Sequence, residues 1–233
     1  MYRAEARPHK ADRIAGLIAA RGVSVANVGD VHVAGHTYRD LEVDCRDNEE
    51  AIAILNDLAR DDALNGEKVR AFARRLWTWA QDAAKRADLA PSTVPELFAR
   101  KVHKIVRDVI EYEDDPEQVF RSSDVTLTLG VGNCVNTARL AVALARAVGL
   151  DARAVGVVPR DDGEITHACA QIAHDGAWHW AEATIAADYG EPPLDAARRL
   201  GILRDDLGKA KKRASSSSPT PCCAACAESS RTT

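Results

Sequence analysis

The segment that most constrains the fold is an apolar helix that begins directly after a cysteine. The sequence Gly130-Val131-Gly132-Asn133-Cys134 leads into residues 135–148, which are mostly small and apolar, and Gly149 follows as a C-terminal cap. Because Arg139 and Arg146 are its only charged residues, nearly every face of the helix should be buried. The rest of the chain must therefore pack around it.

Composition narrows the class of protein. The chain has 233 residues, which suits one compact domain or a large domain with appendages, and its 46% hydrophobic and 28% charged residues exclude wholesale disorder. A net charge of −4 argues against a nucleic-acid binder. No apolar run approaches the roughly 18 to 20 residues of a membrane span, and the charged residues 1–22 lack the apolar region of a secretory signal. We expect a cytoplasmic protein with reduced thiols.

Hydrophobic periodicity predicts helices and short strands before the cysteine. The predicted elements are a helix at 11–20, two or three strands between 23 and 43 with turns at Gly29 and Gly35, a helix from 47, a helix at 66–87, a helix opened by a capping box at Thr93–Glu96, and a short strand through Val125, Leu127 and Leu129.

After the apolar helix, the pattern predicts strands at 152–158, 167–173 and 178–184, the last two joined by a hairpin turn at 174–177. Beyond Leu207, the Lys-, Ser- and Pro-rich composition cannot bury enough apolar surface to fold. We therefore predict three parts, which are an N-terminal α/β extension (1–90), a core (91–207) and a disordered tail (208–233).

Cys134 is the first candidate for chemistry. The unpaired amides and the dipole at a helix N-terminus stabilise a thiolate and can bind an oxyanion. Gly130 and Gly132 allow substrate and backbone to approach closely. Taken alone, a cysteine that starts an apolar helix is more often a buried small side chain.

His167 and Glu182 complete a possible catalytic set. If the hairpin loop between their strands has an even number of residues, both side chains project from the same face of the sheet. The imidazole would then face Cys134, and Glu182 would orient it from the far side, which is the arrangement of nucleophile, base and orienting acid in thiol catalysis. The alternative is a hairpin with an ordinary polar face.

From Tyr112 to Thr184 the chain resembles the transglutaminase-like superfamily of papain-like cysteine enzymes, and within it the bacterial and phage proteins. The resemblance rests on several motifs with matching spacing. They are Tyr112 with Asp115-Pro116, Gly132-Asn133-Cys134, Ala138-Arg139-Leu140-Ala141, the run Leu144 to Arg153, His167, and Trp178 followed by Glu182-Ala183-Thr184.

The resemblance implies an α+β fold in which a central helix carrying the cysteine packs on an antiparallel sheet, after a mainly helical extension. It implies that Cys134 is the nucleophile, His167 the general base and acid, and Glu182 the orienting acid. Asn133 and Thr128 are candidates for the second oxyanion donor, and Trp178 is a candidate substrate contact. The family usually has Asp and Pro in place of Glu182-Ala183, and Asp in place of Asn133 and Asn136.

The implied activity is cleavage or transfer at an amide or peptide bond of a peptide or protein through a Cys thioester, without a metal or organic cofactor. The alternative is a catalytically silent structural or assembly protein, such as a phage component. Two metal interpretations are weak. A site formed by His167, His174 and His179 is disfavoured because His167 and His174 would point to opposite faces of a regular strand. The tail Cys222-Cys223-Ala224-Ala225-Cys226 offers three ligands where structural zinc needs four.

Overall fold

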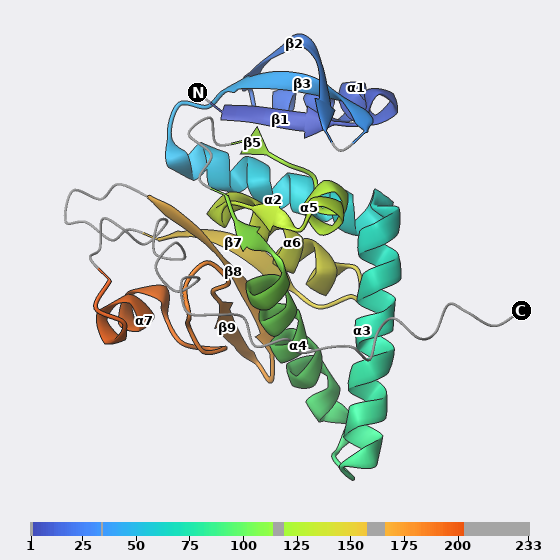
Figure 1. Ribbon diagram of the computed structural model, residues 1–233, viewed down its shortest axis with the longest axis vertical. Helices are drawn as coiled ribbons and strands as arrows, with labels where there is room; N and C mark the ends of the chain where they lie inside the picture. Colours follow the sequence, from blue (N-terminus) through green and yellow to red (C-terminus); the bar gives the residue numbers. More distant parts are fainter. Residues whose placement is uncertain (1, 34, 114–118, 158–165, 203–233) are drawn as a thin grey trace, which may run out of the picture.

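The computed structural model describes residues 2–33, 35–113, 119–157 and 166–202 (Figure 1). The predicted tail with its cysteines, and Asp115-Pro116 of the lead-in motif, lie outside these residues. The helices are α1 (Pro8–Ala19), α2 (Asn48–Asn65), α3 (Glu67–Arg86), the 3-10 helix η1 (Pro91–Thr93), α4 (Val94–Val109), α5 (Ser123–Leu129), α6 (Cys134–Arg146) and α7 (Pro193–Arg199).

Strands form three sheets. They are an N-terminal sheet of order β2-β3-β1-β5, a small parallel pair β4-β6, and a C-terminal antiparallel sheet β7-β8-β9. The strands are β1 (Tyr2–Ala6), β2 (Ser24–Val33), β3 (His36–Asp44), β4 (Glu111–Tyr112), β5 (Val119–Phe120), β6 (Val131–Gly132), β7 (Ala152–Val157), β8 (His167–His174) and β9 (Ala177–Ala181).

Helix α6 occupies the middle of the molecule, as its apolar sequence predicts. Every residue from Val135 to Ala145 is buried. The helix packs against β8 and β7 of the antiparallel sheet on one side and against α2 on another (Figure 1). The α+β fold with a cysteine-bearing helix on an antiparallel sheet is confirmed.

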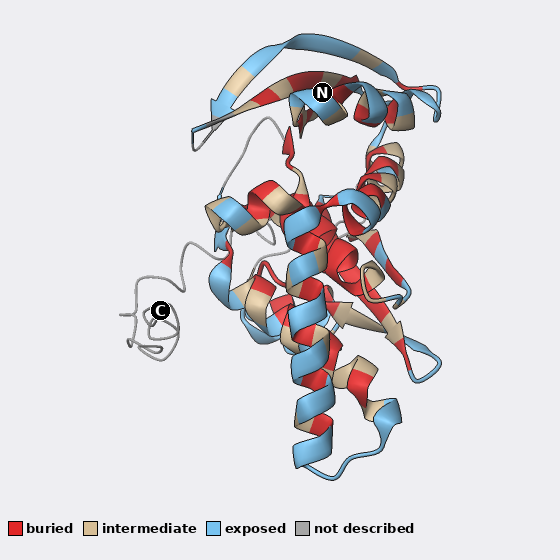
Figure 2. Ribbon diagram, turned by 90° about the vertical axis from the view of Figure 1, so that its right-hand side faces the viewer, coloured by how far each residue is buried: buried red, intermediate tan, exposed pale blue. Residues whose placement is uncertain are grey.

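The N-terminal extension shares the core of α6. One cluster of buried apolar side chains includes residues of β1, α2, α3, α4, α6 and the C-terminal sheet, from Ala4 to Ala183. Helix α3 buries one face against this core and exposes the other, as Figure 2 shows for the helix nearest the viewer. The boundary at residue 90 stays a prediction, and the structure shows that apolar packing continues across it.

One local prediction was wrong, and one strand was not predicted. Val125, Leu127 and Leu129 belong to helix α5, whose Asp124 carboxylate accepts a hydrogen bond from the Val69 N–H of α3. A five-residue alternation is too short to decide between helix and strand. The structure also contains β1, which the sequence analysis missed because its inward side chains are the small Ala4 and Ala6.

Two further corrections concern turn and cap chemistry. Gly29 lies inside β2, at a bulge where the β2–β3 register shifts, and its φ of 138° explains the glycine. Thr93 does precede helix α4, but it forms no capping box. Its hydroxyl donates to the Ala90 carbonyl, and Glu96 pairs with Arg100 instead.

The β8–β9 hairpin is the local feature that matters most for the site. Asp175 and Gly176 form its two-residue turn with positive φ at both positions, the conformation that matches the twist of paired strands. The pair Ala170↔Ala181 sets the register, so Glu182 follows one step beyond it. The loop has an even number of residues, which is the condition under which His167 and Glu182 lie on one face.

A buried ion pair fixes α6 against its neighbours. The Arg139 guanidinium makes two hydrogen bonds to Asp62 of α2, at 2.7 and 3.0 Å, and one to the Phe120 carbonyl at 3.0 Å. The Asp62 carboxylate also accepts from the N–H and hydroxyl of Ser123. These bonds join α6, α2, β5 and the start of α5.

We expect Asp62→Ala to destabilise the fold by about 3–5 kcal/mol, because it leaves the buried Arg139 charge without its partner. Chemical denaturation measures this change in the free energy of unfolding. The matched control is Asp57→Ala on the same helix, which breaks a partly exposed pair with Arg21 and should change stability by at most about 1 kcal/mol. Equal losses in the two variants would contradict the assignment.

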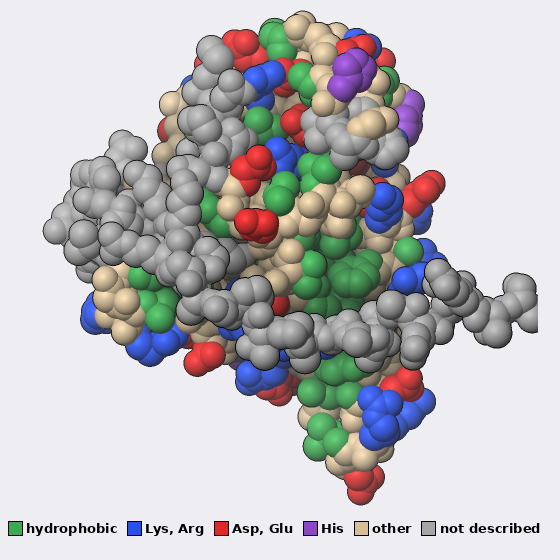
Figure 3. All heavy atoms as spheres, viewed as in Figure 1, with side chains coloured by type: hydrophobic (Ala, Val, Ile, Leu, Met, Phe, Trp, Pro, Cys, Tyr) green, Lys and Arg blue, Asp and Glu red, His purple; other side chains and the backbone are tan. Residues whose placement is uncertain are grey.

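Charged side chains of both signs are interspersed over the face shown in Figure 3.

Within the described part of the chain, no helix combines the length and the apolar character that crossing a membrane requires.

Candidate active site

Cys134 is the first residue of α6, and its surroundings follow from the glycine-rich sequence before it. Asn133 is the N-cap, and its side-chain oxygen accepts from the Asn136 N–H at 3.0 Å. A Cβ on Gly132 would come within 2.9 Å of the Asn136 Cβ, so a larger residue there would displace the first turn. The amides of that turn have no acceptor within the helix. Cys134 itself is partly buried.

His167 and Glu182 are completely buried and joined directly. The imidazole Nε2 lies 2.6 Å from Glu182 Oε2. The other carboxylate oxygen, Oε1, accepts from the backbone N–H groups of Thr184 at 2.5 Å and Ile185 at 3.3 Å. Because a carboxylate with three N–H neighbours is held firmly in place, Glu182 fixes the orientation of the ring.

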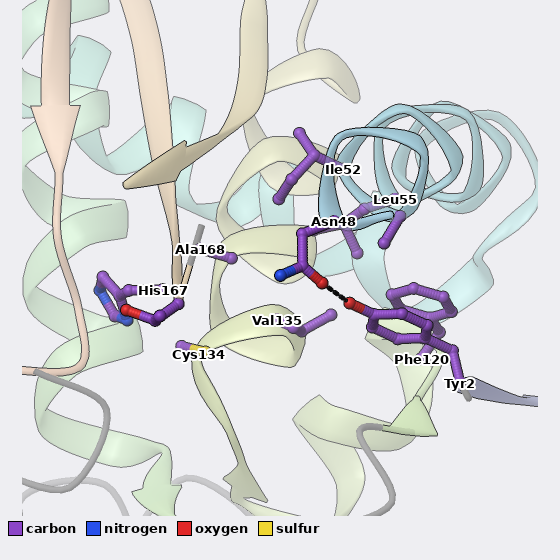
Figure 4. A pocket seen from close by; sticks show the side chains of 11 residues that line it. Tyr2, Asn48, Ile52, Leu55, Phe120, Cys134, Val135, His167 and Ala168 are labelled. Carbon is purple, nitrogen blue, oxygen red and sulfur yellow. Dashed lines mark hydrogen bonds between the residues drawn. The ribbon is translucent and has the colours of Figure 1, made fainter. Parts of the chain in front are cut away.

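The opposite edge of the imidazole faces the thiol. Nδ1 of His167 is buried and has no hydrogen-bond partner among the residues that the structure describes. His167 and Cys134 line the same cavity, and Figure 4 shows them side by side. The structure therefore brings Cys134, His167 and Glu182 together in the order thiol, imidazole, carboxylate.

The charges of this set support one another. Burial disfavours a charged imidazole, but the Glu182 carboxylate and Cys134 outweigh it and raise the pKa of His167 to about 10. Burial alone would raise the pKa of Cys134, yet the adjacent His167 holds it below its usual value. Burial likewise opposes ionisation of Glu182, but His167 and the two backbone amides lower the pKa of this carboxyl. A thiolate–imidazolium pair follows.

His103 is a supporting residue that the sequence analysis missed. It lies buried on α4, and its Nε2–H donates to the Glu182 carbonyl oxygen at 2.7 Å. Burial lowers the pKa of His103, so the ring is neutral and holds the Glu182 backbone without adding charge. In the sequence, the one sign that His103 is buried is its position beside the apolar stripe of α4. That position does not reveal Glu182 as its hydrogen-bond partner.

The other predicted site residues lie elsewhere. Thr128 is exposed on α5, and its hydroxyl accepts from Lys68 and donates to the Asp124 carbonyl. Trp178 is 43% exposed on β9, where the Arg153 guanidinium lies 4.2 Å from its ring centroid. Asn133 serves as the helix cap described above. None of the three is among the residues that line the cavity at Cys134.

The cavity beside Cys134 has a volume of about 60 Å³ (Figure 4). Side chains of the N-terminal extension form one wall, and α6 and β8 form the other. The lining residues are Tyr2, Asn48, Ala51, Ile52, Leu55, Phe120, Cys134, Val135, Thr166, His167 and Ala168. Sequence analysis did not foresee the contribution of Tyr2 and Asn48.

The histidines near the hairpin are engaged with one another. The rings of His174 and His179 stack at 3.9 Å, and His174 bonds Asp175 and the Tyr189 hydroxyl. Over the described ranges, no group of three or more His, Cys, Asp or Glu side chains is arranged to hold a metal ion.

Comparisons with solved structures find three proteins of limited similarity to this chain. A candidate protease from Parabacteroides distasonis has a TM-score of 0.44 and 14% sequence identity, and the match covers 64% of this chain and 29% of that one. For a candidate cysteine protease from Cytophaga hutchinsonii, the TM-score is 0.35 and the identity 21%, with 53% of this chain and 40% of that one covered. For a TGase, the TM-score is 0.34 and the identity 16%, with 76% of this chain and 49% of that one covered. The chain thus spans less than half the length of each. No curated protein matches it.

The family model of the transglutaminase-like superfamily matches residues 66–188, which is more than half of the chain. The matched range includes Cys134, His167 and Glu182, together with the helix and sheet that position them. The chain therefore belongs to the transglutaminase-like superfamily.

Proposed function

We propose that this protein cleaves an amide or peptide bond through a thioester on Cys134. The observation that carries the proposal is the buried alignment of Glu182, His167 and Cys134, with a 2.6 Å contact on one edge of the imidazole and the thiol on the other. A nucleophile, a base and a group that orients the base are the parts that covalent acyl transfer requires.

In the first step, the Cys134 thiolate attacks the carbonyl carbon, and a C–S bond forms as the C=O electron pair moves to oxygen. The oxyanion lies at the N-terminus of α6, where the amide of the first turn stabilises it. The intermediate then collapses, the C–N bond breaks, and the leaving nitrogen takes the proton from His167 Nδ1.

In the second step, neutral His167 takes a proton from a water molecule, and the resulting hydroxide attacks the thioester. The C–S bond breaks, a carboxylic acid leaves, and the thiolate–imidazolium pair returns. Glu182 keeps its charge throughout and stabilises the imidazolium each time it forms.

The cavity supports a small acyl group. Its walls include the apolar side chains of Ile52, Leu55 and Val135, and its volume of about 60 Å³ corresponds to roughly four to six water-sized spheres. A short aliphatic side chain of a peptide fits such a space. We therefore propose a peptide substrate with a small uncharged residue on the acyl side of the bond.

Alkylation by iodoacetamide tests the activated thiol directly. At pH 6, Cys134 should react at least about tenfold faster than N-acetylcysteine, because its lowered pKa leaves more thiolate at that pH. As the pH rises, the alkylation rate of Cys134 should reach its plateau at a lower pH than the alkylation rate of N-acetylcysteine does. Peptide mapping by mass spectrometry assigns each adduct.

The chain contains its own controls. Burial raises the pKa of Cys45 to about 11, and Cys169 is buried in β8 with a pKa well above the usual value. Neither should react at pH 6. The variant His167→Ala should slow Cys134 to the rate of a free thiol or below it, because burial then raises the thiol pKa without the opposing imidazolium. If wild-type Cys134 reacts no faster than N-acetylcysteine, the thiol is not activated and the proposal is wrong.

A further inference from the structure

The N-terminal extension places two polar side chains in the cavity opposite His167. Tyr2 comes from β1 and Asn48 from the first turn of α2, and the Tyr2 hydroxyl donates to the Asn48 side-chain oxygen. In Figure 4 this oxygen faces Tyr2, and the nitrogen end of the same amide is turned toward the side of the cavity that Cys134 and His167 occupy.

Tyr2 is held rigidly. Its backbone pairs with Val43 of β3, and its neighbour Arg3 pairs with Val119 of β5. The ring stacks on Phe120 with a centroid distance of 5.2 Å and an interplanar angle of 1°. A ring fixed by two strands and a stacked partner delivers its hydroxyl to one place.

The hydrogen bond from the Tyr2 hydroxyl to the Asn48 side-chain oxygen sets which way the amide faces. Burial, together with nearby Cys45 and Cys134, raises the pKa of the Tyr2 hydroxyl to about 12, so it keeps its proton and acts as a donor. A donor selects the oxygen of the amide. The NH₂ group must then lie on the other side, toward the thiol.

We propose that Asn48 is the second oxyanion donor of this enzyme and that Tyr2 is its positioning residue. The inference rests on the proposed thioester chemistry. When the Cys134 thiolate adds to the carbonyl carbon, the oxygen gains the electron pair, and it accepts hydrogen bonds from the Asn48 side-chain N–H and the Cys134 backbone N–H. Donors fixed before the reaction are the ones that stabilise such a charge.

This assignment gives the N-terminal extension a role in catalysis. Asn133 and Thr128, the oxyanion candidates from the sequence, are engaged as a helix cap and in a bond with Lys68. Neither of these two residues lines the cavity at Cys134, whereas Asn48 does. The oxyanion site is thus built jointly by α6 of the family core and α2 of the extension.

The test compares two reactions of the same sulfur. Acylation by p-nitrophenyl acetate passes through an oxyanion, and the p-nitrophenol burst measures its rate. Alkylation by iodoacetamide displaces iodide and forms no oxyanion. In Asn48→Ala and in Asn48→Leu, which keeps the side-chain volume, acylation should slow by about 10²–10³-fold. The alkylation rate of Cys134 should stay within about twofold of wild type.

The matched control is Asn65→Ala, which removes the same side chain from the other end of α2. It should leave both rates unchanged. Tyr2→Phe keeps the stacked ring but frees the amide to rotate, so acylation should slow by about tenfold, with alkylation unchanged. In the Asn48→Leu background the same change should have no further effect, because its partner is gone. Additive losses would show that Tyr2 acts through the fold and would overturn its role.

The outcomes separate this inference from the proposed function. Unchanged acylation in both Asn48 variants, or an equal loss of acylation and alkylation, overturns the role of Asn48 while leaving the thioester chemistry intact. If wild-type protein neither forms an acyl-enzyme nor shows accelerated alkylation of Cys134, both proposals are wrong.

Discussion

Replacing Cys134 with alanine is expected to lower turnover of p-nitrophenyl acetate by roughly 10⁴- to 10⁶-fold, since removing the nucleophile of a covalent mechanism removes the whole pathway. The acyl-enzyme should disappear with it, which intact-mass spectrometry detects after a short incubation. Hydroxylamine added to the wild-type reaction should trap the acyl group as a hydroxamate, because a thioester is open to attack by amines.

The matched control is Cys45→Ala. Cys45 is also a partly buried free thiol, but its pKa is raised to about 11, so it carries little thiolate near neutrality. Its removal should leave turnover unchanged. A folded Cys134→Ala variant with wild-type turnover would assign the chemistry to another group and favour the view of this fold as a structural scaffold.

The chemistry-bearing residues could be predicted because their cues are local. The glycine-flanked start of an apolar helix makes Cys134 a candidate thiol, and the resemblance to the family adds the weight that this cue lacks alone. The Asp175-Gly176 turn fixes the parity of the hairpin, and hence the shared face of His167 and Glu182. Each of these inferences uses residues that are close in sequence or joined by one short turn.

The supporting contacts could not be predicted, because they join distant parts of the chain. Asn48 lies 46 positions after Tyr2, and Arg139 lies 77 positions after Asp62. No periodicity or motif links such pairs. They depend on which strands pair and which helices pack, and a single sequence does not reveal that.

Changing Glu182 to glutamine should reduce turnover by roughly 10³- to 10⁴-fold although the side chain keeps its size. The carboxylate has N–H groups on both oxygens, two from the backbone and one from His167. If the glutamine oxygen stays on the backbone, its NH₂ meets Nε2, which must then lose its proton. The remaining proton moves to Nδ1 and points at the sulfur, so the ring cannot accept a proton from the thiol.

The same substitution should change the pH dependence in a definite direction. Without the carboxylate, the pKa of His167 falls from about 10 toward its usual value, and the pKa of Cys134 rises because it loses an imidazolium neighbour. The pH at which alkylation of Cys134 levels off should therefore move upward. Glu182→Asp keeps the charge and should keep the wild-type profile, with a smaller loss of turnover. An unshifted profile in Glu182→Gln would contradict the coupling.

The free energy of unfolding gives an independent measure of the ion pair between Glu182 and His167. The pKa of Glu182 is lower in the folded protein than in the unfolded chain. Its contribution to the stability of the fold is therefore present at a pH above the unfolded-state pKa and is lost as the pH falls through the folded-state pKa. The pKa of His167 is raised, so its contribution is complete below about pH 6.5 and is lost as the pH rises through about 10. Glu182→Gln should thus cost about 3–5 kcal/mol near neutrality and less at both extremes. Glu96→Gln, which breaks the exposed pair with Arg100, should cost at most about 1 kcal/mol. A loss in Glu182→Gln that did not vary with pH would mean that packing, and not the buried charge pair, holds this strand end in place.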